Sequence, residues 1–278
     1  MSRYFAHAPI AHSLKKGERD KPLDVEYRVN NLLFHFVAPE RIGADDWRIL
    51  CGLVALATAE NYASTDKSHE TIDSEETDHV ARLLKHSVSI KTTYAEIAQE
   101  AGYARESGSA YRVRDSLKRW FKASVFVEKL GISNSLDVEG HHILEELKAR
   151  DQGNRVELSF CPVLSAAILG GSGEYLRLDM PEFRRLTSDV SRLLHIRLHW
   201  INQGKFGKVG IDTLVAYAYS ADPVEDYTIR KRRKAIRDAL EELRSNLNWS
   251  VEHKDGMYLI GRPACSAKQA PAASSVSS

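Results

Sequence analysis

The segment Thr228–Arg237 constrains the fold of this chain more than any other part of its 278 residues. Six of its ten residues are Lys or Arg and none is acidic, whereas the whole chain is nearly neutral, with 39 basic and 38 acidic residues. Apolar residues recur at helical spacing in and beyond this segment, at Ile229, Ile236, Leu240, Leu243 and Leu247. The pattern predicts an amphipathic helix that packs one face on a core and presents a cationic ridge on the other.

A rigid cationic ridge suits a polyanion, because Lys and Arg replace the counterions that condense on phosphates. A solvated basic helix on an ordinary domain is the alternative, and the helix alone does not decide between them. Its neighbours favour nucleic acid. Ile211–Tyr219 reads as a short helix, Ser220–Asp226 as a break, and Thr228 as the N-cap of the basic helix. Trp249–Ile260 reads as two strands around Asp255-Gly256, a hairpin signal.

Short helix, turn, basic helix and hairpin is the order of a winged helix-turn-helix, whose second helix enters the major groove of DNA. The same order also occurs in α+β domains that bind no nucleic acid. A second, weaker copy lies earlier in the chain. Thr92–Gly102 and Ser109–Ser124 read as its two helices, and Val125–Lys129 and His141–Arg150 as the strands of a longer wing. The second of these helices could equally support a core or a dimer contact.

The two patterns predict an α+β protein of two tandem winged helix-turn-helix domains, and the length suits two domains of ordinary size. We expect a flexible N-terminal tail, a first winged-helix domain with an acidic insertion at about residues 62–78, a second domain that carries the main DNA-recognition helix, and a disordered C-terminal tail. These four parts are expected to span residues 1–22, 23–152, 153–263 and 264–278.

The composition argues against a membrane protein, since no run approaches the ~20 apolar residues that span a bilayer. The first residues lack the pattern of a signal peptide. Three widely spaced cysteines without a CxxC motif fit a reducing compartment, so we expect a cytoplasmic location.

Signatures of catalysis are mostly absent, and we expect no enzyme activity, no cofactor and no metal. Gly204–Lys208 is not a P-loop, because Val209 stands where Ser or Thr should follow the lysine to reach Mg²⁺. It reads as a basic turn that could touch phosphate. His195 and His199, four residues apart, are a weak metal motif without a third ligand, and a pair facing solvent or DNA is the preferred interpretation. No His-x-His triplet of the kind found in rolling-circle nicking enzymes occurs.

Several long motifs resemble RepC, the replication initiator family of IncQ-type broad-host-range plasmids. The matching stretches follow one another in the order and approximate spacing of that family and cover most of residues 23–263. They are Ile42–Ala57, Ser191–Leu198, Gly204–Leu214 and Thr228–Leu240, and Gly261–Pro263 closes the domain in the same way.

The resemblance implies a tandem winged-helix protein that binds direct repeats (iterons) in double-stranded plasmid origin DNA. It further implies that binding opens nearby duplex and recruits a plasmid-encoded helicase and primase. A homodimer through the first domain is also plausible for initiators of this kind. A tandem winged-helix transcriptional repressor without a replication role remains the alternative, and a nicking enzyme or nuclease is a third.

The expected DNA-contacting residues lie mainly on the basic helix, which begins at Thr228. We expect Arg230, Arg232, Arg233 and Arg237 to read bases or clamp the helix, because Arg binds guanine bidentately, and Lys231 and Lys234 to hold phosphates. Lys205 and Lys208 are secondary phosphate candidates, and Lys254 lies at the tip of the wing. In the first domain the weaker candidates are Arg112, Arg114, Lys118 and Arg119.

Overall fold

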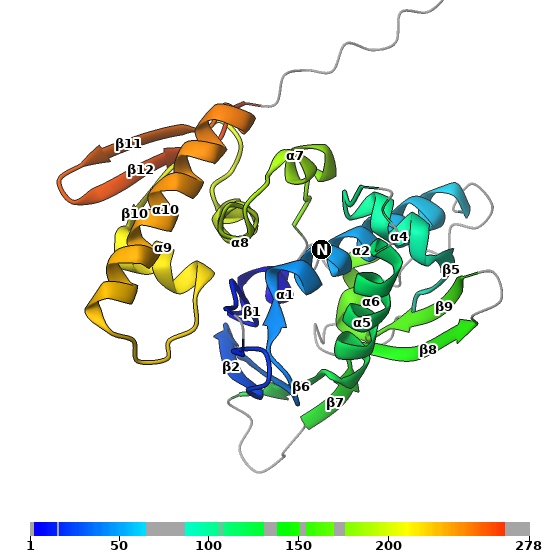
Figure 1. Cartoon of the computed structure of the whole chain (residues 1–278). Helices are drawn as coiled ribbons and strands as arrows, with labels where there is room; N and C mark the ends of the chain where they lie inside the picture. The colour runs from blue at the N-terminus through cyan, green and yellow to red at the C-terminus, as the bar shows by residue number, and fades with distance from the viewer. Residues whose placement is uncertain are drawn as a thin grey trace, which may run out of the picture.

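The computed structural model of the chain contains two winged-helix units joined through a shared interface (Figure 1). The structure describes residues 3–15, 17–64, 87–104, 106, 108–130, 138–150, 154–169 and 176–264.

The second unit contains the predicted short helix, basic helix and hairpin in that order, preceded by a helix and a strand. The strand includes residues 206–208 of the segment that the sequence predicts as a basic turn. Its elements are α8 (Asp189–Arg197), β10 (Phe206–Gly210), α9 (Ile211–Ala218), α10 (Asp226–Leu247), β11 (Ser250–Lys254) and β12 (Met257–Gly261). The three strands form an antiparallel sheet in the order β10-β12-β11. Asp255 and Gly256 both have positive φ, at 53° and 75°, as a tight hairpin turn requires.

The first unit repeats this arrangement, which confirms the tandem winged-helix prediction. Its elements are α2 (Ala44–Ser64), β5 (Ser89–Thr93), α4 (Tyr94–Glu100), α5 (Ser109–Lys122), β8 (Leu144–Arg150) and β9 (Arg155–Phe160). The sheet order β5-β9-β8 matches β10-β12-β11 strand for strand. Thr93 caps α4 through a reciprocal pair of hydrogen bonds with Glu96, so the predicted helix start is confirmed.

The wing of the first unit differs from the prediction. Residues 141–150 do not form one strand, because β6 (Ser124–Lys129) and β7 (Val138–His142) join β2 (Leu23–Val29) and β3 (Leu32–Ala38) in a separate sheet of order β2-β3-β6-β7. The chain leaves that sheet at the buried Ile143, whose backbone bonds to Ala123 on one side and Cys161 on the other. The wing is therefore β8–β9.

The boundary predicted at residue 152 is also wrong, because it falls inside the β8–β9 hairpin. β9 pairs with β5 as well as with β8, so it belongs to the first unit. The buried helix α6 (Pro162–Ile168) follows, and α7 (Met180–Arg185) precedes α8. Residues 176–179 form no strand.

The N-terminal residues are part of the core and do not form the flexible tail that the sequence suggested. α1 (Arg3–His7) and β1 (Ala11–His12) place Tyr4, Phe5 and Ile10 at 2%, 0% and 1% exposure. β1 pairs in parallel with β4 (Ile42–Gly43), and the backbone N–H of Ser13 donates to the carbonyl of Ala218 in α9 (2.8 Å). This segment therefore lies between the two units and contacts both.

Ion pairs also join the units near the second helix-turn-helix. Arg41 donates to both carboxylate oxygens of Asp222 (2.8 and 2.9 Å), and Lys21 reaches the same carboxylate (3.2 Å). The hydrogen bonds from Arg41 hold the pKa of the Asp222 carboxyl well below its usual range. Asp222 lies in the turn between α9 and α10, so the first unit helps to position the basic helix.

Other expectations fall on residues that the structure does not describe. The acidic insertion lies outside the described residues from residue 65 on, and so does the C-terminal tail from residue 265 on. None of the helices in the described ranges combines the length and apolar character that a bilayer-spanning segment needs.

Candidate nucleic-acid interface

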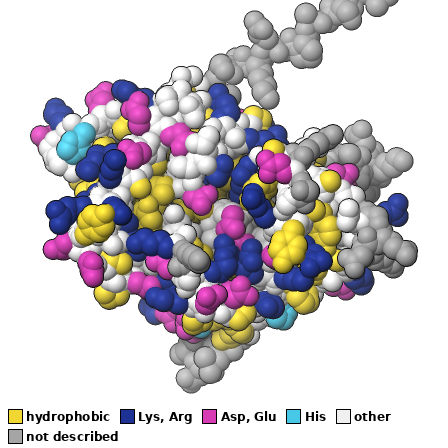
Figure 2. Space-filling model, in the orientation of Figure 1, with side chains coloured by type: hydrophobic (Ala, Val, Ile, Leu, Met, Phe, Trp, Pro, Cys, Tyr) yellow, Lys and Arg dark blue, Asp and Glu magenta, His cyan; other side chains and the backbone are white. Residues whose placement is uncertain are grey.

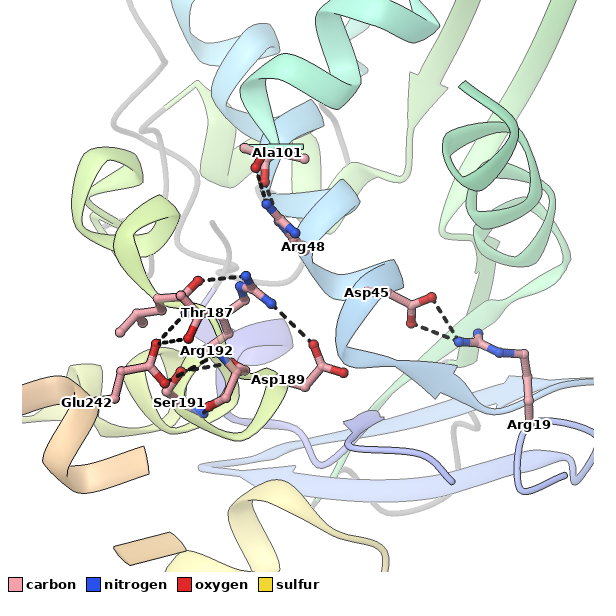
Figure 3. Close-up of polar contacts among 12 residues, drawn as sticks. Arg19, Asp45, Arg48, Ala101, Thr187, Asp189, Ser191, Arg192 and Glu242 are labelled. Atoms are coloured by element: carbon pink, nitrogen blue, oxygen red, sulfur yellow. Dashed lines mark hydrogen bonds and ion pairs between the residues drawn. The ribbon is translucent and has the colours of Figure 1, made fainter. Parts of the chain in front are cut away.

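The helix α10 has a buried face and an exposed cationic face, as its sequence predicted. Ile236, Leu240, Leu243 and Leu247 are each no more than 2% exposed and form the inner face. Just before α8, the Thr187 hydroxyl donates a hydrogen bond to the carboxylate of Glu242 (2.9 Å), which fixes the C-terminal part of α10 (Figure 3).

The cationic stripe of α10, defined here as Arg230, Lys234 and Arg237, is exposed to solvent along one side of the helix. These residues are spaced i, i+4 and i+7, which aligns them on one face. No described carboxylate pairs with any of the three at ion-pair distance. Figure 2 shows Lys and Arg side chains, with acidic ones among them, over the side of the molecule where Figure 1 places α9, α10 and the hairpin.

Two further cations flank the stripe but have partners within the protein. The Nζ of exposed Lys231 lies 4.4 Å from the ring centroid of Tyr227, one turn earlier. Arg233 donates two hydrogen bonds to one oxygen of Asp212 on α9 (3.0 and 2.7 Å). The side chains of Arg233 and Asp212 are 41% and 73% exposed, so the pair contributes little to stability and leaves the guanidinium available to another anion.

Arg232 does not lie with the other predicted cations. It is only 6% exposed, donates to the carbonyl of Ser220 (3.2 Å), and its guanidinium lies 4.8 Å from the ring centroid of Tyr219. The prediction that Arg232 faces DNA is therefore corrected. The sequence spacing already indicated that Arg232 is buried, because it lies three residues after Ile229 and four before Ile236, on the apolar face of the helix.

We expect Arg232→Ala to act on stability and not on DNA contacts. Losing the buried guanidinium leaves the Ser220 carbonyl without this donor and a gap beside Tyr219, at a cost of about 1–3 kcal/mol. Thermal unfolding measures the loss, and Arg230→Ala on the exposed side serves as the control with an unchanged melting temperature. An unchanged melting temperature in Arg232→Ala would contradict the structural role.

Thr228 is not the N-cap of α10. The helix begins two residues earlier, at Asp226, with Glu225 at the cap position and no side-chain cap hydrogen bond. Thr228 lies within the first turn and is half-buried, and its backbone N–H donates to the carbonyl of Glu225 (2.9 Å). The helix therefore begins earlier than predicted, and the cations still lie on it.

The remaining candidates of the second unit are exposed. Lys208 on β10 pairs with Leu259 of β12, and Lys254 at the end of β11 pairs with Met257 of β12. The two lysines lie on the same face of the sheet, because their partners are two residues apart and side chains alternate along a strand. Lys254 adjoins the Asp255-Gly256 turn at the wing tip, as predicted. Lys205 precedes β10 and is also exposed.

The four candidates on α5 divide into two kinds. Arg112 and Lys118 are exposed, whereas Arg114 is half-buried, with its guanidinium 5.4 Å from the ring centroid of Tyr111. Arg119 binds one oxygen of the fully buried Asp46 carboxylate (2.7 and 2.8 Å), and Arg19 binds the other oxygen. Arg119 therefore belongs to a buried ion cluster, which corrects its assignment as a DNA contact.

We expect Arg119→Ala to destabilise the first unit. Asp46 would keep Arg19 and the backbone N–H of Gly43 but lose one of its two guanidinium partners inside the protein, at a cost of about 1–3 kcal/mol or more. Lys118→Ala removes the neighbouring exposed cation and is the matched control. Chemical denaturation of both variants measures the difference, and equal stability of the two would contradict the role of the cluster.

The two histidines considered as a metal pair are buried and do not face solvent or DNA. His195 and His199 are 0% and 5% exposed, with ring centroids 4.8 Å apart, and His195 contacts Glu182 (3.2 Å). Burial lowers the pKa of His195 and brings that of His199 to about 3, so His199 is neutral at pH 7. In the described ranges, no group of three or more His, Cys, Asp or Glu side chains is placed to hold a metal ion.

Two successive copies of the same winged-helix topology, the second with an exposed cationic recognition helix, define a tandem winged-helix protein. A sequence profile of the family described as Replication protein C (RepC) matches residues 5–264. The chain therefore belongs to the RepC replication protein family, which confirms the resemblance seen in its motifs. No curated protein sequence matches it.

Solved structures with the same fold include domains 2 and 3 of RctB. Two such crystal structures superpose with TM-scores of 0.61 and 0.59 at 12% and 13% sequence identity; they cover 95% and 93% of this chain and 97% of the RctB chain in each case. The Pi initiator protein in complex with iteron DNA is a more distant match, with a TM-score of 0.44, 17% identity, and coverage of 84% of this chain and 97% of that one.

Proposed function

We propose that this protein is a plasmid replication initiator that binds direct repeats in an origin through its two winged-helix units. The exposed cationic stripe on the second helix of a helix-turn-helix, in a member of the RepC family, supports the proposal most directly. In this docking the N-terminal half of α10 enters the major groove and the β11–β12 wing approaches the backbone.

The proposed contacts are those that the structure leaves accessible. Arg230, Lys234 and Arg237 face the DNA, Lys231 and Arg233 exchange their internal partners for phosphate or base edges, and the first turn at Thr228 lies close to the backbone. Lys205, Lys208 and Lys254 hold phosphates beside the groove. In the first unit, Arg112 and Lys118 are the accessible cations for a second contact, with Arg114 beside them.

Opening of the duplex is the second part of the proposal, and it draws on binding free energy. Smooth bending of a site costs on the order of 1–6 kcal/mol. Several phosphate contacts from each unit, repeated over adjacent direct repeats, can supply that energy. The opened region then receives the plasmid helicase and primase in the bacterial cytoplasm, and the protein also forms a homodimer through the first unit.

The first experiment measures binding of the purified protein to a tandem-repeat origin fragment and to a scrambled fragment over a salt series. Tight, repeat-dependent binding with a steep salt slope is expected, because each phosphate contact releases condensed counterions. Equal, weak binding to both fragments would contradict specific recognition.

Permanganate reactivity of unpaired thymines on the same fragment, with and without helicase and primase, tests opening. A transcriptional repressor would bind the repeats and leave the thymines unreactive. Cleavage of the fragment with Mg²⁺ or Mn²⁺ would instead indicate a nicking enzyme.

A further inference from the structure

A pocket of about 360 Å³ lies where the two units meet, between α1 and β2 on one side and α8 with its following turn and α9 on the other. Besides His7, its lining includes three tyrosines and a tryptophan from four separate segments: Tyr4, Tyr27, Trp200 and Tyr217. Its volume is in the range of pockets that hold small ligands. None of the residues assigned above to duplex DNA lines it.

The wall of this pocket carries a buried cation without an acidic partner. Arg197 is 4% exposed and donates to the carbonyl of Ala6 (2.9 Å), and no described carboxylate pairs with it. Burial lowers the pKa of Arg197 to about 10, so the side chain still carries its charge at pH 7. A buried charge is costly unless an anion or several hydrogen-bond acceptors satisfy it. The pocket therefore offers a positive charge to an anionic ligand.

The aromatic lining offers a stacking surface as well. Trp200 is 42% exposed, whereas Trp47, Trp120 and Trp249 are at most 2% exposed. Every nucleobase has a π face, and stacking a base on an aromatic side chain contributes without regard to sequence. An aromatic ring for stacking and a guanidinium that no described carboxylate pairs with together match a nucleotide, which carries a flat base and an anionic phosphate.

We propose that this pocket binds a single nucleotide unit, with its base against Trp200 and the half-buried Tyr27 and Tyr217 and its phosphate or a base carbonyl at Arg197. Single-stranded DNA is the source that fits the protein, since duplex opening at an origin exposes unpaired nucleotides; that choice of source rests on the proposed function. The pocket takes residues from both units, so an occupied pocket also favours the docked arrangement of the two.

The test uses the intrinsic fluorescence of the full chain, because Trp200 is the one exposed tryptophan of the four. A short single-stranded deoxyoligonucleotide is titrated in parallel with the same strand lacking bases and with free deoxynucleoside monophosphates. The oligonucleotide is expected to quench the fluorescence, and the abasic strand is not. Quenching by the monophosphates at the same concentration of nucleotide would assign the site to free nucleotides instead of strands.

Trp200→Ala is expected to weaken binding of the oligonucleotide about 5- to 150-fold, which corresponds to about 1–3 kcal/mol for one stacked base. Trp200→Phe keeps a ring and should recover much of the affinity while abolishing the quenching signal. Phe126→Ala removes an aromatic side chain of similar exposure, 38%, outside the pocket and is the matched control.

The affinity of each variant for the duplex repeats is measured as well, because it tests the proposed function independently of the pocket. Trp200→Ala should bind the duplex repeats as the unmodified protein does. No quenching by any nucleotide, with duplex binding intact, would overturn the pocket proposal alone. Loss of repeat-specific duplex binding in the unmodified protein would instead contradict the initiator proposal, whatever the fluorescence shows.

Discussion

Replacing Arg230, Lys234 and Arg237 together by alanine is expected to abolish repeat-specific DNA binding while leaving the fold intact. The three side chains are exposed, lie on one face of α10, and have no carboxylate partner among the described residues. A base or phosphate contact of this kind contributes about 1–3 kcal/mol. A total loss of about 3 kcal/mol or more reduces affinity at least about a hundredfold.

The salt dependence of binding gives this variant a second readout. If all three side chains hold phosphates, the slope of log K against log salt concentration becomes shallower by up to about 2.7. Fluorescence anisotropy on the tandem-repeat fragment measures both quantities. Arg244→Ala removes an exposed cation from the other end of the same helix, where it pairs with Glu241, and should change neither. If the triple variant binds DNA like the unmodified protein, α10 is not the recognition helix.

Phe5→Ala is expected to destabilise the protein by about 3–5 kcal/mol, the usual cost of truncating a buried aromatic side chain. Phe5 is fully buried and meets Phe36 of β3 edge to face at 5.2 Å between ring centroids, while the adjacent Tyr4 stacks on Phe34 at 4.6 Å. The cavity opens where the N-terminal segment joins the two units. The melting temperature should fall by about 6–20 °C for a protein of this size.

Phe206→Ala makes the same truncation at a position that is 60% exposed, and its stability should be nearly unchanged. Thermal unfolding by circular dichroism compares the two variants directly. Equal melting temperatures would show that residues 3–12 are a dispensable tail, as the sequence alone suggested.

The N-terminal segment shows why part of the fold could not be predicted from the sequence. α1 has five residues, too few to show helical periodicity and too few to be stable alone. Only its burial against β3 and α8 orders it. The prediction for the wing of the first unit failed for a related reason, since the sequence predicts one strand over residues 141–150 and only the bend at Ile143 divides them between two sheets.

The sequence by itself determined the elements whose signals are local. The apolar spacing of α10, the capping box at Thr93 and Glu96, and the Asp255-Gly256 turn each follow from the conformational preferences of neighbouring residues. The order of these elements defined both winged-helix units, and the motifs indicated the family. Arg232 could have been assigned to the buried face from the same spacing.

Only the tertiary structure decided which cations are available to a ligand. Arg119 and Lys118 are neighbours with the same charge, yet Arg119 is bound to the buried Asp46 and Lys118 is exposed. The pocket around Arg197 and Trp200 likewise joins side chains from segments far apart in the chain. Burial and ion pairing depend on contacts between distant residues, which no local pattern records, because these contacts exist only after the units have packed together.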